Sequence, residues 1–175
     1  MENNNTRKMV LSAVFCALVY VATWLSIPTP PIGNINLGDC IIILSANILG
    51  GPWAVAASAI GAMLCDLSSG YGMYAPATFI IKGFMVVIIL SVKKNPTNKL
   101  KSISNIGFIL SALCAEAFMV CGYYLYESVL LGLGKGALAN IPFNAIQGGL
   151  NIVIATLVYV LVLKNVAHVY NLFDK

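Results

Sequence analysis

The sequence predicts an all-α, polytopic membrane protein with six transmembrane helices and with both termini in the cytoplasm. The first supporting observation is composition: of the 175 residues, 59% are hydrophobic and only 9% are charged, whereas about a quarter of a soluble domain is charged. The second is that the apolar residues form blocks of membrane-spanning length instead of amphipathic stripes. The third is the position of the basic residues, which orients the chain. Residues 1–175 are therefore expected to form a single integral membrane domain.

Four apolar blocks are long enough to be read directly as membrane spans. The first follows Arg7 and Lys8, as a signal peptide would, but it is longer than a signal-peptide core and further apolar blocks follow it. We therefore expect it to remain in the membrane. The four spans are Met9–Ile27, Ala75–Val92, Asn105–Tyr126 and Ala137–Leu163.

The segment from Leu37 to Leu67 is too long for one span. As a single helix it would measure about 46 Å, against a hydrocarbon core of about 30 Å. Gly50, Gly51 and Pro52 fall in its middle, where glycine permits a sharp turn and proline removes a helical donor. The segment is expected to form a helical hairpin with spans at about 37–50 and 52–67. Both helices are short, so we expect local membrane thinning or a shielded position.

The distribution of lysine and arginine favours six spans over five. With six spans, the basic residues of segments 7–8, 93–101 and 164–175 lie on one side of the membrane, and Lys135 lies on the other. With five spans, the basic loop at 93–101 would face away from the N-terminus, against the positive-inside rule. Both termini are therefore placed in the cytoplasm.

The three loops on the outer side have a distinct composition. The first, at 26–36, is rich in Pro, Gly and Asn and is expected to follow a defined irregular path. The second, at 68–76, carries Tyr71 and Tyr74 among glycines, and the third, near Lys135, is again rich in glycine. Two interpretations stay open: the loops are ordinary connectors with tyrosines as interfacial anchors, or they close over a ligand.

Polar side chains from several spans are predicted to share one layer in the outer half of the membrane, about 10 to 15 Å below its surface. An unpaired charge in lipid costs several kcal/mol, so these groups should face inward and meet. Lys82 is expected to be neutralised by Glu116, by Asp66 or by a ligand. The layer contains Asn47, Lys82, Glu116, Asn144, Gln147 and Asn151, with Asp39 and Asp66 nearer the outer rim.

Two explanations for this layer remain: an ion pair that locks the helices together, or a binding cavity. Aromatic walls with a few mixed polar groups suit a small, flat, hydroxylated heterocycle. The spans contain no arginine, so a bidentate clamp for a carboxylate or phosphate is not expected. A neutral or weakly charged ligand is favoured.

The sequence lacks the usual signatures of catalysis. It has no phosphate-binding loop, no HExxH metal motif, and no membrane serine or cysteine with a histidine partner. The five cysteines include no CxxC pair and are expected to be small buried side chains, while His168 is expected in a solvated tail. We expect no catalytic residue, no metal, no cofactor and no nucleic-acid partner.

A single site in the outer half, without an inverted repeat, makes a poor stand-alone carrier, so a partner protein is expected. Ala13 and Ala17 lie four residues apart in the first span and share one helix face. Small residues at this spacing let another helix approach closely. These two alanines are the candidate contact with the partner.

The sequence resembles the substrate-binding S-components of energy-coupling factor (ECF) vitamin importers. The resemblance covers nearly the whole chain and is carried by Ala13 and Ala17, by PTPPIGNINLGD at Pro28–Asp39 and by DLSSGYGMYAPATFIIKG at Asp66–Gly83. It is similar to the S-components for riboflavin, pyridoxine and hydroxymethylpyrimidine.

The resemblance implies how the protein would work. An S-component captures a vitamin in an outward-facing cavity closed by its first and third loops. It then docks on a transmembrane coupling protein with two cytoplasmic ATPases, in the bacterial plasma membrane. On this chain, Ala13 and Ala17 would contact the coupling protein. The implied substrate-binding residues are Asn36, Asp66, Tyr71, Tyr74, Lys82, Glu116, Asn144 and Gln147.

The ligand itself stays open at this point. Pyridoxine or hydroxymethylpyrimidine is expected first, and riboflavin or pantothenate next. Two other functions also stay open: a stand-alone carrier of small solutes, and a structural membrane subunit without a ligand.

Overall fold

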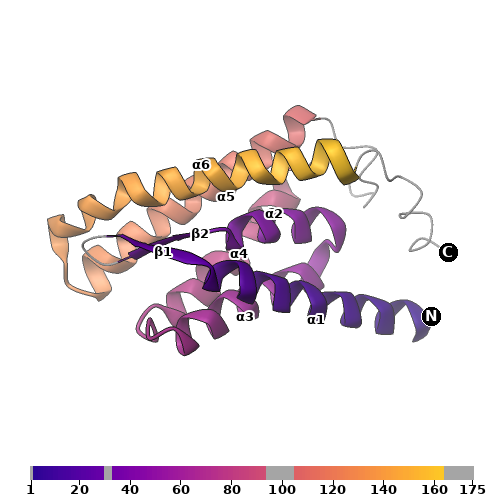
Figure 1. The fold of residues 1–175 in the computed structure, drawn as a ribbon, viewed down its shortest axis with the longest axis horizontal. Coiled ribbons are helices and arrows are strands. Elements are labelled where there is room, and N and C mark those ends of the chain that lie inside the picture. The colour runs from indigo at the N-terminus through magenta and orange to yellow at the C-terminus, as the bar shows by residue number, and fades with distance from the viewer. Residues whose placement is uncertain (1, 30–32, 94–104, 164–175) are drawn as a thin grey trace.

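The computed structural model describes residues 2–29, 33–93 and 105–163. Within these residues the chain forms six α-helices and one two-stranded hairpin (Figure 1). The basic residues at 94–101 and 164–175, and His168, lie outside the described residues. The elements are α1 (Glu2–Trp24), β1 (Ser26–Thr29), β2 (Gly33–Asn36), α2 (Gly38–Ile48), α3 (Gly51–Ser68), α4 (Ala75–Val92), α5 (Asn105–Leu125) and α6 (Ile141–Val158).

The helix boundaries follow the local sequence. The predicted break between α2 and α3 lies at Gly50 and Gly51, whose φ angles are 63° and 58°. Only glycine adopts these angles without strain, and Pro52 then stands in the first turn of α3, where its missing N–H costs nothing. A π-helical turn at Tyr126–Leu130 extends α5, and a 3₁₀ turn at Gly134–Asn140 leads into α6.

The segment at 26–36 was predicted to follow an irregular path, but its described residues, 26–29 and 33–36, form the hairpin β1–β2. Ser26 pairs with Asn36 and Thr29 pairs with Gly33 in an antiparallel register. The first helix consequently ends at Trp24, three residues before the predicted end of its span. Strands of four residues are too short to give a clear alternation of polar and apolar positions, so the sequence did not indicate them.

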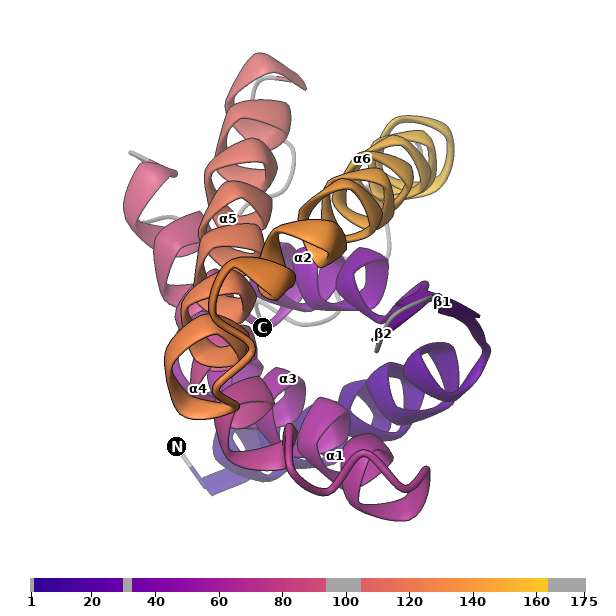
Figure 2. The same ribbon diagram turned by 90° about the vertical axis from the view of Figure 1, so that its left-hand side faces the viewer.

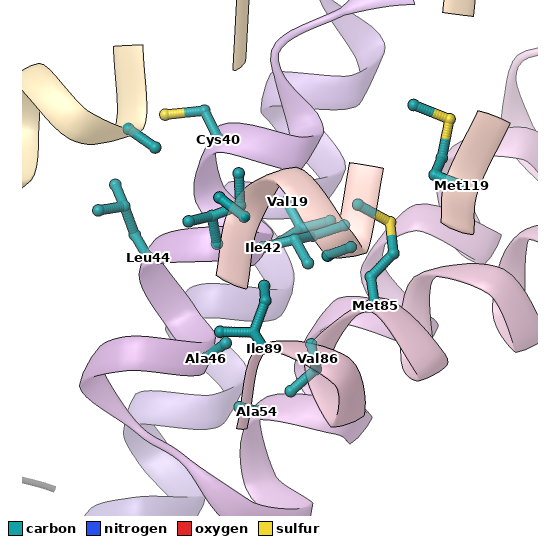
Figure 3. Packing of buried hydrophobic residues seen from close by; sticks show 14 of the residues in the cluster. Val19, Cys40, Ile42, Leu44, Ala46, Ala54, Met85, Val86, Ile89 and Met119 are labelled. Carbon is teal, nitrogen blue, oxygen red and sulfur yellow. The ribbon is translucent and has the colours of Figure 1, made fainter. Parts of the chain in front are cut away.

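The short helix α2 lies at the centre of the molecule. It packs against α1, α3, α4 and α6, and nine of its 11 residues are buried. Figure 3 shows Ile42 of α2 close to Met85 and Ile89 of α4 in the apolar core. Local membrane thinning or a shielded position was expected for this short helix, and in the structure α2 is shielded by its neighbours.

The outer surface of the helices is apolar. Large hydrophobic side chains are exposed on several helices, including Leu18 of α1, Leu113 of α5 and Leu157 of α6. An exposed apolar belt of this kind is what a lipid bilayer covers. α2 is an apolar helix that is shorter than a membrane span. Four described helical segments are long and apolar enough to cross a membrane: Asn5–Trp24, Ala75–Val92, Asn105–Leu130 and Gly134–Leu163.

Close packing against α3 fixes the rotation of α1. A Cβ atom at Gly61 of α3 would lie 2.5 Å from the carbonyl oxygen of Cys16 in α1, so only glycine lets the two helices approach this closely. Ser12 also donates a hydrogen bond to the carbonyl oxygen of Trp53, at 2.9 Å. With this side of α1 buried, Ala13 and Ala17 are exposed.

Candidate functional site

A small cavity of about 60 Å³ lies at the end of the molecule that holds the hairpin and the α3–α4 connection. Figure 2 looks at this end, with the hairpin on one side and α4 and α5 on the other. The cavity is lined by Thr23, Gly33, Asn34, Asn36, Asp66, Tyr71, Tyr74, Thr78, Lys82, Tyr123, Glu127, Asn144 and Gln147.

All of the eight predicted substrate-binding residues except Glu116 line this cavity. Several side chains of the lining, Thr23 among them, were not predicted from the sequence, and helical spacing could have indicated three of them. Thr78 lies one turn before Lys82, Tyr123 lies two turns after Glu116, and Glu127 lies one turn beyond Tyr123.

Lys82 forms its ion pair with Asp39, not with Glu116 or Asp66 as predicted. Its Nζ atom lies 2.6 Å from Oδ1 of Asp39, and both side chains are almost fully buried. The ammonium group also lies 5.3 Å from the centre of the Tyr123 ring, within range of a cation–π contact. The prediction failed because Gln147 and Asn151 of α6 hold the start of α2, with its buried Asp39, within the bundle and not at its outer rim.

A connected set of hydrogen bonds surrounds this ion pair. Gln147 donates from Nε2 to Oδ2 of Asp39 at 2.7 Å, and its Oε1 accepts from the backbone N–H of Asn36 at 3.1 Å. Asn151 donates to the carbonyl oxygen of Asn36 at 2.9 Å and accepts from the N–H of Cys40 at 2.8 Å. We call Asn36, Asp39, Lys82, Gln147 and Asn151 the inner network; it ties the hairpin and the start of α2 to α4 and α6.

The α3–α4 connection is fastened to α5 through Glu127. Tyr74 donates a hydrogen bond to Oε1 of Glu127 at 3.3 Å, and Asn140 donates to Oε2 at 2.8 Å. Burial, followed by the nearby Glu127 carboxylate, raises the pKa of the Tyr74 phenol, so this hydroxyl remains a protonated donor. Tyr126 donates a further hydrogen bond to the carbonyl oxygen of Met73. Both oxygens of Glu127 are thus engaged within the protein.

Two buried carboxylates have oxygens without a hydrogen-bond partner among the described residues. Asp66 lines the cavity, is only 8% exposed, and its Oδ2 has no partner. Glu116 lies outside the cavity lining and has no partner for either oxygen. It packs against α6 at Gly148, where a Cβ atom would lie 3.0 Å from its Oε2.

Asn47, which was predicted to join the polar layer, lies away from the cavity. It is buried, and its Nδ2 donates to the carbonyl oxygen of Ile43, one turn earlier in the same helix, at 2.7 Å. Within residues 2–29, 33–93 and 105–163, no group of three or more His, Cys, Asp and Glu side chains could hold a metal ion. The site is therefore a small aromatic cavity with amide, hydroxyl and carboxylate groups in its wall.

The fold and the site together define a polytopic membrane protein with a polar cavity at one end of its helices. The family model of the ECF-type riboflavin transporter, S component, matches residues 3–165 of the chain. The chain belongs to this family, which confirms the resemblance noted in the sequence. The family is a transporter component and not an enzyme.

Two relatives are similar to this chain over most of its length. The thiamine precursor transporter HmpT of Lactococcus lactis subsp. cremoris is 29% identical over 150 residues, which cover 84% of this chain and 82% of that protein. An uncharacterized protein of Pyrococcus woesei, described as lying in a gap 3' region, is 34% identical over 122 residues, covering 70% of this chain and 77% of the relative.

A solved structure has the same fold. The S component of a bacterial ECF transporter superposes with a TM-score of 0.67 at 18% sequence identity, and the alignment covers 98% of this chain and 99% of that one. At this low identity the similarity supports the fold alone.

Proposed function

We propose that this chain is the substrate-capture component of an ECF-type, ATP-dependent vitamin importer. It binds a small heterocyclic vitamin or vitamin precursor in the cavity and delivers it by docking on a transmembrane coupling protein with two cytoplasmic ATPases. The observation that carries the proposal is the cavity itself, which gathers aromatic and polar side chains from β2, α3, α4, α5 and α6 at one end of a membrane protein of this family.

The size of the cavity favours a ligand with a single ring. One enclosed water molecule needs ~10–15 Å³, so about 60 Å³ corresponds to about four to six waters. Hydroxymethylpyrimidine or pyridoxine matches this space better than the three fused rings of riboflavin. The name of the relative HmpT, a thiamine precursor transporter, supports the pyrimidine. Pantothenate is disfavoured because Asp39 already neutralises Lys82.

We place the cavity on the outer face of a bacterial plasma membrane, with six spans in a single domain of residues 1–175 and with both termini in the cytoplasm. The N-terminal end of α1 and the C-terminal end of α6 lie at the same end of the molecule (Figure 1). The cavity lies at the opposite end. Arg7 and Lys8 stand at the terminal end, which supports its cytoplasmic location under the positive-inside rule.

The proposed docking surface is the exposed face of α1 at Ala13 and Ala17. Small side chains on an exposed helix face let a second helix pack closely. This face is separate from the cavity, since neither alanine belongs to the cavity lining. Ligand capture and partner docking are thus assigned to different surfaces.

The test is substitution of Ala13 and Ala17 by tryptophan. We expect the double variant to lose complex formation with the coupling protein, and to lose cellular uptake, while isothermal titration with hydroxymethylpyrimidine gives unchanged binding. The matched control is Val153→Trp, because Val153 is also exposed, but on α6. It should retain binding, complex formation and uptake.

Three outcomes would contradict the proposal. Loss of ligand binding together with complex formation would refute the separation of the two surfaces. Uptake into vesicles that contain this chain alone, without ATP, would instead support a stand-alone carrier. Absence of binding for all four candidate vitamins would support a structural subunit without a ligand.

A further inference from the structure

Asp66 differs from the other charged groups at the cavity because one of its oxygens is left without a partner. It lies in the last turn of α3, is 8% exposed, and its Oδ2 accepts no hydrogen bond from any described residue. A buried acceptor without a donor costs about 1–3 kcal/mol. Asp66 lines the cavity, while Oδ2 itself is covered by protein atoms, so a small rotation of the carboxyl group would let a ligand donor satisfy this oxygen.

The remaining charged groups of the cavity are already paired. Lys82 is held by Asp39 at 2.6 Å, and Glu127 accepts hydrogen bonds from Tyr74 and Asn140 on its two oxygens. The positive charge of Lys82 is thus balanced within the protein, while the Asp66 carboxyl group lines the cavity without a countercharge at hydrogen-bond distance. An anionic ligand would lie next to this carboxylate and would find no unpaired cation in the lining.

The lining also offers rings against which a flat ligand can pack. Tyr71 and Tyr74 lie edge to face, with ring centres 6.3 Å apart, and Tyr123 stands 6.4 Å from Tyr74. All three line the same cavity as Asp66. The site therefore combines a small aromatic wall with one unpaired anionic acceptor.

We propose that Asp66 anchors the ligand by accepting a hydrogen bond from an N–H group, so that the site selects amino-substituted or protonated nitrogen heterocycles. This inference rests on the proposed function and specifies the substrate class of the same cavity. A ring that presents only carbonyl or carboxylate oxygens at this position leaves Oδ2 unpaired and adds a repulsive contact. Asp66 is thus the specificity-determining residue of the site.

The test compares two probes that differ in one group. The first is hydroxymethylpyrimidine, which carries an amino group on its ring; the second is its analogue with a hydrogen atom in place of that amino group, which has no donor at this position. A hydrogen bond to a charged group corresponds to an affinity difference of about 10- to 100-fold. Isothermal titration should show that the wild-type protein binds the amino compound more tightly by this factor.

In the Asp66→Asn variant, affinity for the amino compound should fall by about 10- to 100-fold, and the preference over the analogue should largely disappear. The thermal unfolding midpoint should not fall, because the substituted oxygen has no partner in the protein. The control is Ser69→Ala, an exposed neighbour outside the cavity lining. It should bind both probes as the wild type does.

The results separate this inference from the proposed function. If the wild type binds no heterocycle at all, the proposed function is wrong. If it binds hydroxymethylpyrimidine and Asp66→Asn keeps the same preference, the inference about Asp66 is wrong while the function stands. If Asp66→Asn lost affinity for both probes equally and had a lower unfolding midpoint, Asp66 would have a structural role, and this result would also overturn the inference.

Discussion

The inner network and the cavity wall around Asp66 lie at the same end of the protein but differ in how their polar groups are paired. In the inner network, Asp39 is engaged on both carboxylate oxygens and Gln147 on both ends of its amide. In the wall, Oδ2 of Asp66 has no partner, and the side chain of Asn144 makes no hydrogen bond within the described residues. Paired groups hold the fold, whereas unpaired groups that face a cavity are available to a ligand.

The largest effect is expected when the ion pair of the inner network is broken. Asp39→Asn leaves the Lys82 ammonium group buried without its countercharge, and removing one partner of a buried pair costs about 3–5 kcal/mol. The unfolding midpoint in detergent, followed by circular dichroism, should fall sharply, and little folded protein should be recovered.

A double variant checks the cause of this loss. Asp39→Leu with Lys82→Met removes both charges together, and replacing a buried pair by apolar side chains is often neutral. We expect it to be more stable than Asp39→Asn alone. If the free energy of unfolding of Asp39→Asn alone lay within about 1 kcal/mol of the wild-type value, the ion pair would not be what stabilises the fold.

An intermediate effect is expected for Gln147→Leu. From the sequence alone, this change was expected to weaken ligand binding. The structure adds that it deprives Oδ2 of Asp39 and the N–H of Asn36 of their partners, at about 1–3 kcal/mol for each buried group. The free energy of unfolding should therefore fall by about 2–4 kcal/mol, measured by thermal or chemical unfolding.

Asn144→Leu is the matched comparison from the same helix. It should lower the affinity for hydroxymethylpyrimidine while it changes the unfolding free energy by less than about 0.5 kcal/mol. If both leucine variants lost affinity at full stability, the distinction between the inner network and the wall would not hold.

The smallest effect is expected at Glu116, the buried carboxyl group that neither lines the cavity nor pairs with a described residue. Glu116→Met removes two buried oxygens without partners and should raise the stability by about 1 kcal/mol. For a chain of this length the unfolding midpoint would rise by about 2–4 °C. A fall of the midpoint, with loss of ligand binding, would instead assign Glu116 to the site.

The sequence predicted the helices and most of the cavity lining, because a membrane restricts both the backbone conformation and the positions of charged side chains. Buried backbone in lipid must form helices, and charged groups such as Lys82 must face inward. The break at Gly50 and Pro52 was likewise visible from local backbone preferences. These constraints act on single residues or on one helix, so they can be read from the sequence.

The sequence did not predict how groups from different helices pair. Asp39 became the partner of Lys82 because Gln147 and Asn151 of α6 hold Asn36 and the start of α2 within the bundle. The two strands that lead into α2 have only four residues each and leave no periodic signal. Glu116 was assigned to the site from its depth, but its direction depends on the close approach of α6 at Gly148. Depth along a helix follows from counting residues, whereas rotation and tertiary contacts do not.

The central claim is that the cavity beside Asp66 holds a small nitrogen heterocycle while the inner network holds the fold. The most direct test is mass spectrometry of the small molecules released from the purified, then denatured, protein. The wild type should release one heterocycle with an N–H donor in stoichiometric amount, and a folded Asn144→Leu variant should release much less. Release of lipid alone, or equal amounts of ligand from both proteins, would contradict the claim.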